Sequence, residues 1–159
     1  NEIISHLLPF IDESYQSQDS RRRDASMIAF GSLIDANGAT QLNQILLNAH
    51  PIVLTLSKDQ CPRVRDSALW ALGKMYETQP ELTNNLDLTA QSLSVSYDGL
   101  KDLPRVATNA CWAFNFMVKA MYELASSQCG SRPQTLYISI HYESILSAVY
   151  KTIKRFYTL

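Results

Sequence analysis

The chain has 159 residues, of which 46% are hydrophobic, and its 14 basic and 15 acidic residues leave a formal charge of -1. This length supports one ordinary domain, and the balanced charge excludes a global field that would recruit nucleic acid or an anionic membrane. No apolar run approaches the roughly 18 residues of a membrane span, and no signal peptide is visible. Cys61, Cys111 and Cys129 are widely spaced without a C-x-x-C pair, which favours a reducing compartment over a disulfide framework or zinc site. We expect an intracellular globular chain and, since it begins at Asn1, a piece of a longer protein.

A sequence repeat with a period of 42 residues organises the chain. The stretch PRVRDSALWAL at 62–72 returns as PRVATNACWAF at 104–114, and Arg23 begins an earlier copy of the segment at Arg65. A fixed period of roughly 20 to 50 residues is typical of stacked structural units rather than of a single closed core. We therefore read the chain as consecutive units of similar structure.

Each unit predicts two helices in chain order. The first helices carry apolar residues and, in two units, a proline at the same depth, which would bend the helix. The second helices begin near Arg21, Arg63 and Arg105 and place apolar residues at helical spacing. The expected repeats are 2–36, 41–77 and 83–125, followed by a partial repeat at 136–157. No strand alternation competes, so the prediction is an all-α fold, an α-solenoid of antiparallel helix pairs.

The last part of the chain is expected to be incomplete. The third unit's second helix should end near Leu124, and the Ser/Gly/Pro-rich stretch 126–135 reads as a loop. A single amphipathic helix then follows. Its apolar residues can bury only one side, so we expect this end to associate or fray; these residues are Ile145, Leu146, Val149 and Ile153.

Trp70 and Trp112 occupy the same register of consecutive second helices, away from the apolar stripe, and Ile28 takes that place in the first unit. An aromatic at such a place more often packs against a neighbouring helix, but two in register favour a docking surface. Indoles attract guanidinium groups and nearby carboxylates pair with the same cations. The predicted ligand is an arginine- and lysine-rich helix, and the other candidate site residues are Asp24, Asp35, Asp66, Glu77, Asn109, Asn115 and Phe116.

The stretch KDQCPRVRDSALWALGKMYE resembles a HEAT-repeat second helix with its entry turn. In that family, residues matching Asp59 and Arg65 form a ladder between repeats. Here the ladder is expected to be interrupted, because the equivalent pairs are Ser17 with Arg23 and Lys101 with Ala107.

The segments RRDASMIAFG, RVRDSALWALGKMYE and PRVATNACWAF are more narrowly similar to the middle HEAT repeats of the importin-β (karyopherin-β) family. This resemblance implies a right-handed superhelix whose concave face is lined by the second helices. On that face, tryptophans matching Trp70 and Trp112 receive the importin-β-binding helix of importin-α or a basic cargo. It also implies that the full protein binds Ran-GTP and phenylalanine-glycine nucleoporins, the latter in grooves between first helices. The implied location is the cytoplasm, the nucleus and the nuclear envelope at its pores.

An enzyme is the least favoured class. His6, His50 and His141 lie on separate predicted first helices without a partner spacing for a catalytic triad or a metal site, so no cofactor is expected. The run 21–23 of arginines is flanked by acidic residues and reads as solvated or ladder arginines rather than a nucleic-acid patch. The alternative function is a HEAT-repeat scaffold or regulatory subunit of another complex; a general scaffold has no need of exposed indoles in register.

Overall fold

A computed structural model describes residues 2–37, 43–129 and 136–157, and every element in these ranges is helical. The α-helices are α1 (Glu2–Ser14), α2 (Ser20–Asn37), α3 (Asn43–Leu56), α4 (Pro62–Thr78), α5 (Leu86–Gly99), α6 (Pro104–Cys129) and α7 (Tyr142–Tyr157). Two 3-10 helices, η1 (Pro80–Asn84) and η2 (Tyr137–His141), precede α5 and α7. The expected all-α solenoid is confirmed.

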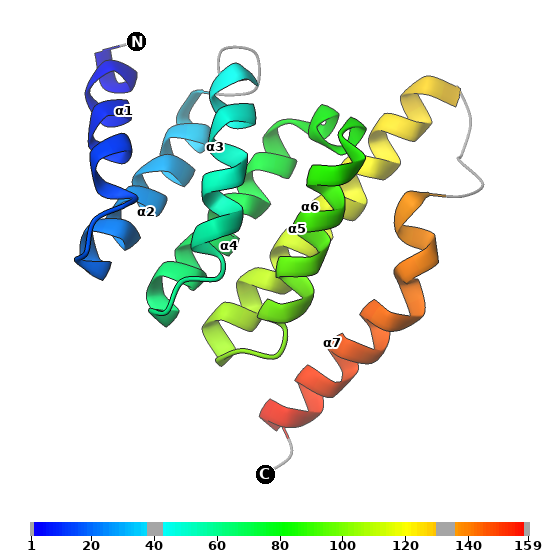
Figure 1. The fold of residues 1–159 in the computed structure, drawn as a ribbon. Helices are drawn as coiled ribbons and strands as arrows, with labels where there is room; N and C mark the ends of the chain where they lie inside the picture. The colour runs from blue at the N-terminus through cyan, green and yellow to red at the C-terminus, as the bar shows by residue number, and fades with distance from the viewer. Residues whose placement is uncertain (1, 38–42, 130–135, 158–159) are drawn as a thin grey trace.

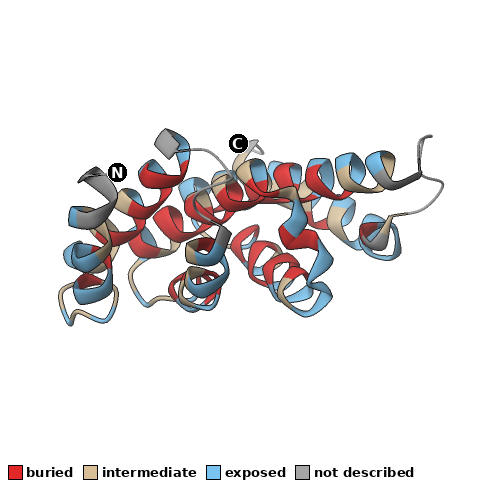
Figure 2. Ribbon diagram, turned by 90° about the horizontal axis from the view of Figure 1, so that it is seen from above, coloured by how far each residue is buried: buried red, intermediate tan, exposed pale blue. Residues whose placement is uncertain are grey.

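The helices form two layers. In Figure 1, α1, α3 and α5 lie in front, and α2, α4 and α6 lie behind them, each beside its predecessor. Viewed at a right angle in Figure 2, buried residues gather where the two layers meet. Each helix pair therefore buries its apolar side against its partner and against the neighbouring pair, as expected for a repeat array.

Local sequence signals account for the helix ends. Pro62 occupies the first turn of α4, where a backbone N–H would have no partner within the helix, so its absence costs nothing. The helix ends with its C-cap residue Gln79, whose N–H donates to the Met75 carbonyl. Asn85 caps α5 by accepting a hydrogen bond from the Leu88 N–H at 3.1 Å. Pro9 and Pro51 lie inside α1 and α3, as the sequence predicts.

Helix α4 is the centre of the core. It packs against α2 on one side and α6 on the other, with α3 and α5 against its inner face. Val64, Ala68, Leu72 and Met75, which the helical spacing assigns to the core, are fully buried. None of the described helices is long and apolar enough to cross a bilayer.

The C-terminal part differs from the expectation in its helix boundaries. Helix α6 continues to Cys129, past the predicted end near Leu124, because its residues keep helical hydrogen bonding into the serines that follow. The expected single last helix is divided into η2 and α7, and η1 was not predicted at all. Leu146 and Ile153 of α7 are about half exposed, whereas Ile145 and Val149 are partly covered by the core. Residues 130–135 of the predicted loop lie outside the described residues.

Candidate protein-docking face

The second helices α2, α4 and α6 share one outer face, which we call the second-helix face: Ile28, Trp70 and Trp112 with their exposed neighbours on these helices. Trp70 is half-buried on it. Its indole lies against Gly31 of α2 so closely that a Cβ built on Gly31 would come within 2.7 Å of the indole Cε3. This tryptophan therefore fills the joint between the first two repeats and exposes only part of its ring.

Trp112 takes a different position despite the matching register. It is 54% exposed, and its ring packs at a tilt against Phe116 with centroids 5.4 Å apart and planes at 47°. Phe116 itself is buried against Gly73, the residue equivalent to Gly31. Because Phe116 occupies the space above that glycine, Trp112 is held outward. Of the two indoles, the one on α6 is therefore the more accessible.

Two of the predicted acidic residues belong to joints between repeats. The Ser67 hydroxyl donates to the Asp24 carboxylate. One repeat on, Asn109 Nδ2 donates to Asp66 Oδ1 at 2.7 Å, and Arg105 Nη2 lies 2.8 Å from the other oxygen of the same carboxylate. The Asp66 side chain is only 9% exposed. These contacts join equivalent positions of successive second helices, so Asp66 and Asn109 stabilise the stack.

The remaining acidic residues form a bridged cluster beside Trp70. Lys74 Nζ lies 2.8 Å from Asp35 Oδ1 and 3.0 Å from Glu77 Oε2. The two carboxylates stay accessible, with side chains 64% and 37% exposed. The hydrogen bonds that Lys74 donates to Asp35 and then to Glu77 raise the pKa of Lys74, so its ammonium stays charged.

The structure therefore divides the predicted site residues into two groups. The accessible members of the second-helix face are Ile28, Asp35, Glu77, Trp112 and Asn115. The members used in joints between helices are Asp24, Asp66, Trp70, Asn109 and Phe116. The division was invisible in the sequence because the period assigns Trp70 and Trp112 the same register.

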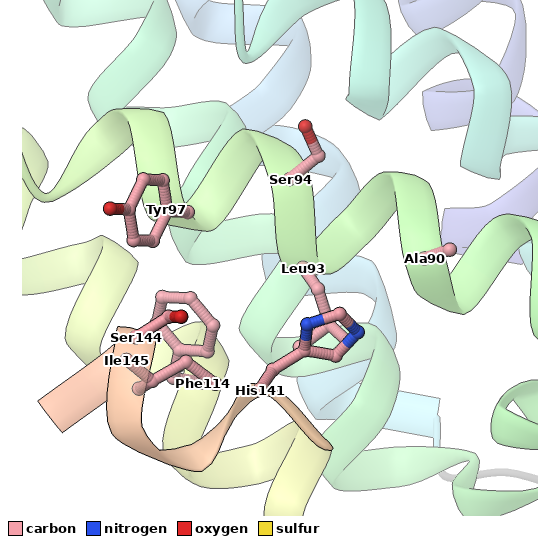
Figure 3. A pocket seen from close by; sticks show the side chains of 8 residues that line it. All are labelled: Ala90, Leu93, Ser94, Tyr97, Phe114, His141, Ser144 and Ile145. Carbon is pink, nitrogen blue, oxygen red and sulfur yellow. The ribbon is translucent and has the colours of Figure 1, made fainter. Parts of the chain in front are cut away.

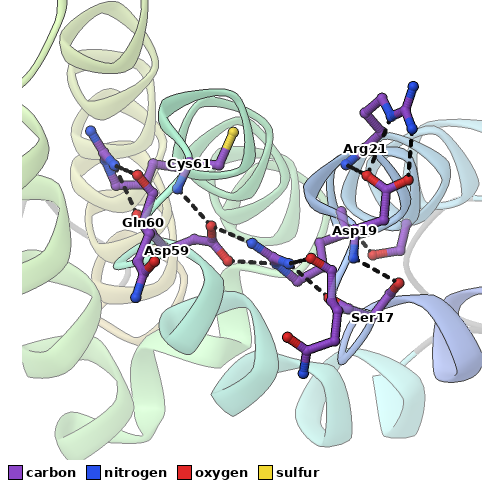
Figure 4. Close-up of polar contacts among 10 residues, drawn as sticks. Ser17, Asp19, Arg21, Asp59, Gln60 and Cys61 are labelled. Carbon is purple, nitrogen blue, oxygen red and sulfur yellow. Dashed lines mark hydrogen bonds and ion pairs between the residues drawn. The ribbon is translucent and has the colours of Figure 1, made fainter.

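An arginine ladder connects the turns that join the first and second helix of each unit. Arg23 binds both carboxylate oxygens of Asp59 in the next repeat at 2.7 and 2.9 Å and donates to the carbonyl of Ser17 in its own turn. Figure 4 shows Asp59 and Ser17 on either side of this joint, each connected by dashed lines to the guanidinium between them. Arg65 repeats the arrangement one unit on, with Asp102 at 2.5 and 2.8 Å. The Arg65 guanidinium holds the pKa of Asp102 below its ordinary value.

The expectation of an interrupted ladder, with Asp59 and Arg65 as its one complete pair, needs correction. Each guanidinium reaches forward to the carboxylate of the following turn and touches only the backbone of its own turn, as Arg65 does at the Asp59 carbonyl. In the third unit the carboxylate is Asp102, one residue after the position that the period assigns. Strict spacing from Asp59 points to Lys101 and misses it.

Ala107 stands where the third ladder arginine would be, and another residue takes over its backbone contacts. In the first two units the guanidinium donates to two consecutive carbonyls of the turn, such as those of Asp59 and Gln60. The equivalent carbonyls of the third unit belong to Lys101 and Asp102, and both accept hydrogen bonds from Arg155 of α7. The last described helix thus supplies the hydrogen-bond donors that an alanine at position 107 cannot offer to these carbonyls.

A cavity of about 380 Å³ lies on the side of the first helices, between α5 and the segment formed by η2 and α7. Figure 3 shows Leu93, Tyr97, Phe114 and Ile145 around it, with His141 at its edge. Its lining is mainly apolar, which suits an apolar side chain better than a polar substrate.

A buried polar cluster was missed by sequence reasoning. His50 is fully buried, and its Nε2 lies 3.3 Å from the Tyr76 hydroxyl and 3.2 Å from the Ser92 hydroxyl. Tyr76 also donates to Ser92 at 3.0 Å, which ties α3, α4 and α5 together. Burial lowers the pKa of His50 to about 4. His6 and His141 are exposed, and no group of three or more metal-ligating side chains occurs in the described part of the chain.

Comparison with known proteins supports the resemblance. A family model described as HEAT-like repeat matches residues 20–75. The chain is 35% identical to importin subunit beta-1 of Arabidopsis thaliana over 78 residues, which cover 48% of this chain and 9% of that protein. The fold agrees with yeast importin-β (Kap95p) over 93% of this chain and 16% of that one, with a TM-score of 0.74 at 23% identity. The chain is thus similar to importin-β, in sequence over about half of its length and in fold over nearly all of it.

Two further comparisons extend the likeness. The chain is 28% identical over 81 residues to importin subunit beta-1 of Saccharomyces cerevisiae, again over 9% of that protein's length. It also superimposes on Kap95p from a study of Kap95p binding to RanGDP with a TM-score of 0.78 at 24% identity. The chain spans less than a fifth of the length of these relatives. The comparisons support a nuclear transport receptor family.

Proposed function

We propose that this chain is a docking segment of a nuclear transport receptor and binds a basic helix on its second-helix face. The partner would be the importin-β-binding helix of importin-α or a basic segment of a cargo, bound without catalysis. The observation that carries the proposal is the exposed indole of Trp112, seated on Phe116 next to a helix whose Glu77 and neighbouring Asp35 remain accessible. Indole faces and carboxylates together suit guanidinium and ammonium groups.

The other activities belong to the full protein. Kap95p has been solved in a study of its binding to RanGDP and in a complex with Nup1. By analogy, the full protein would bind Ran-GTP and phenylalanine-glycine nucleoporins and move between cytoplasm and nucleus through the pores of the nuclear envelope. The cavity between α5 and α7, with its apolar lining, is where a nucleoporin phenylalanine would fit on this segment.

A titration with an arginine-rich helical peptide tests the docking face. We expect the chain to bind this peptide, and Trp112→Ala to weaken binding by roughly 0.5 to 2 kcal/mol, the size of one cation–π contact. Binding should also weaken at higher salt, because the charges are solvent-exposed. Asn48→Ala, on the opposite layer, is the matched control and should bind like the original chain. If neither salt nor Trp112→Ala changes the affinity, the second-helix face is not the site, and a scaffold role becomes the better account.

A further inference from the structure

Lys74 lies in an unusual position for a lysine on the second-helix face. Its side chain is only 20% exposed, yet its ammonium is directed at two carboxylates that are themselves largely accessible. Asp35 comes from α2 and Glu77 from one turn further along α4. A lysine that merely solvates a helix would be expected to extend into water, since surface ion pairs contribute little to stability.

The bridge lies next to the tryptophan at the first joint. Trp70 and Lys74 follow one another by one turn on α4, and their contacts on α2, Gly31 and Asp35, are also one turn apart. The ion pair between Lys74 and Asp35 therefore extends the contact between α2 and α4 that Trp70 and Gly31 begin. A guanidinium that approached the exposed carboxylates here would meet oxygens already paired with Lys74.

The second ion pair of the face differs from this one. Arg105 pairs with Asp66, but Asp66 is only 9% exposed and also accepts a hydrogen bond from Asn109. A partner's cation has little access to that carboxylate, whether Arg105 is present or not. The carboxylates that Lys74 occupies, in contrast, are accessible to a basic ligand.

We propose that Lys74 is an internal competitor for the basic helix, holding Asp35 and Glu77 in place of the ligand's own cation. This inference rests on the proposed function. Binding then exchanges one ion pair for another instead of adding a new one, which limits the affinity at this joint and leaves the empty cluster with one net negative charge instead of two. Lys74 determines how strongly the face binds and does not itself need to touch the ligand.

Charge removal at Lys74 tests the inference. Lys74→Met keeps the methylene stem and removes the ammonium, so we expect the arginine-rich peptide to bind roughly two to five times more tightly at low salt, the size of an exposed ion pair freed for the ligand. Lys119→Met is the control: it removes one charge from the same face, but Lys119 lies 3.7 Å from Glu123 alone and both are at least half exposed. This control should change the affinity less than twofold.

A second comparison identifies the carboxylates as the cause. Adding Asp35→Asn and Glu77→Gln to Lys74→Met should cancel the gain and return the affinity to about that of the original chain. If the chain binds the peptide and Lys74→Met gains no more than Lys119→Met, the competitor role is wrong while the docking face stands. If neither the original chain nor Lys74→Met binds, both the docking face and the competitor role fall. Matching melting temperatures among the variants ensure that the affinities compare folded proteins.

Discussion

The indole of Trp70 lies against the backbone of Gly31, and this contact decides what the tryptophan does. A Cβ at Gly31 would meet three atoms of the six-membered ring. A Cβ at the corresponding glycine one repeat on, Gly73, would lie 3.5 Å from Ala113 and from Phe116, an ordinary van der Waals separation. The same residue type in the same register therefore serves close packing in one joint and tolerates a side chain in the other.

Alanine substitution of the two glycines should separate these roles. We expect Gly31→Ala to lower the free energy of unfolding by about 1 to 3 kcal/mol, because the ring of Trp70 must move out of the joint. Gly73→Ala should be neutral or stabilising by up to about 1 kcal/mol, since alanine is the better helix former and its methyl group fits. Chemical unfolding of both variants measures the difference. Equal effects would show that Trp70 adapts to the methyl group at no cost.

The two tryptophans should differ in the same measurement. Trp70→Ala removes a half-buried ring from the joint between α2 and α4 and should cost about 2 to 3 kcal/mol, somewhat less than for a ring buried in the core. Trp112→Ala removes a ring that is 54% exposed and should cost about 1 kcal/mol or less. A larger cost for Trp112 would mean that its stack on Phe116, and not ligand binding, is its main role.

The fold was predictable because the period of 42 residues sets both the helix count and their packing. Apolar spacing located the core residues of α4, such as Ala68 and Leu72, and the second helices begin within one residue of the arginines near which the sequence places their starts. The helix pairing follows from the repeats alone, since a two-helix unit can bury its apolar face only against its neighbours.

The site was predictable only as a face, and the exceptions have physical causes. Register arithmetic treats Trp70 and Trp112 as equivalent, yet the bulk of Phe116 over Gly73 moves the second indole outward. The contacts of Asp66 with Asn109 and Arg105 depend on side chains from the next repeat, and no spacing rule within one helix reveals them. Likewise Arg155 of α7 makes the backbone contact that a ladder arginine of α6 would make at the third turn.

Acid should destabilise the chain through His50. Burial lowers the pKa of His50 to about 4 from the ordinary 6.5, so between these values the unfolded chain binds a proton that the folded chain does not. The stability from the neutral imidazole is complete above about pH 6.5 and falls as the pH decreases toward 4, by about 3 kcal/mol in total. Unfolding free energies measured across this range check the prediction.

Two variants isolate the contribution of His50. His50→Gln removes the titrating group, so the stability difference between the original chain and this variant should shrink steadily as the pH falls from 6.5 to 4. His6→Gln, at an exposed position on α1, should follow the original chain. A constant difference between the original chain and His50→Gln would place the acid sensitivity elsewhere.

Arg155 should hold α7 on the stack. Its guanidinium donates to three consecutive carbonyls, including that of Leu100 at 3.0 Å and that of Asp102 at 2.5 Å, and Thr152 adds a bond to Leu100 at 2.8 Å. Arg155→Ala leaves these carbonyls to water, so we expect amide exchange in α7 to become about tenfold faster, equivalent to about 1.4 kcal/mol, with little change in α4. Lys151→Ala, an exposed residue one turn earlier on the same helix, is the matched control and should leave exchange unchanged. Equal exchange in the two variants would show that apolar contacts of Ala148 and Ile145, and not the arginine at the open turn, keep the last helix in place.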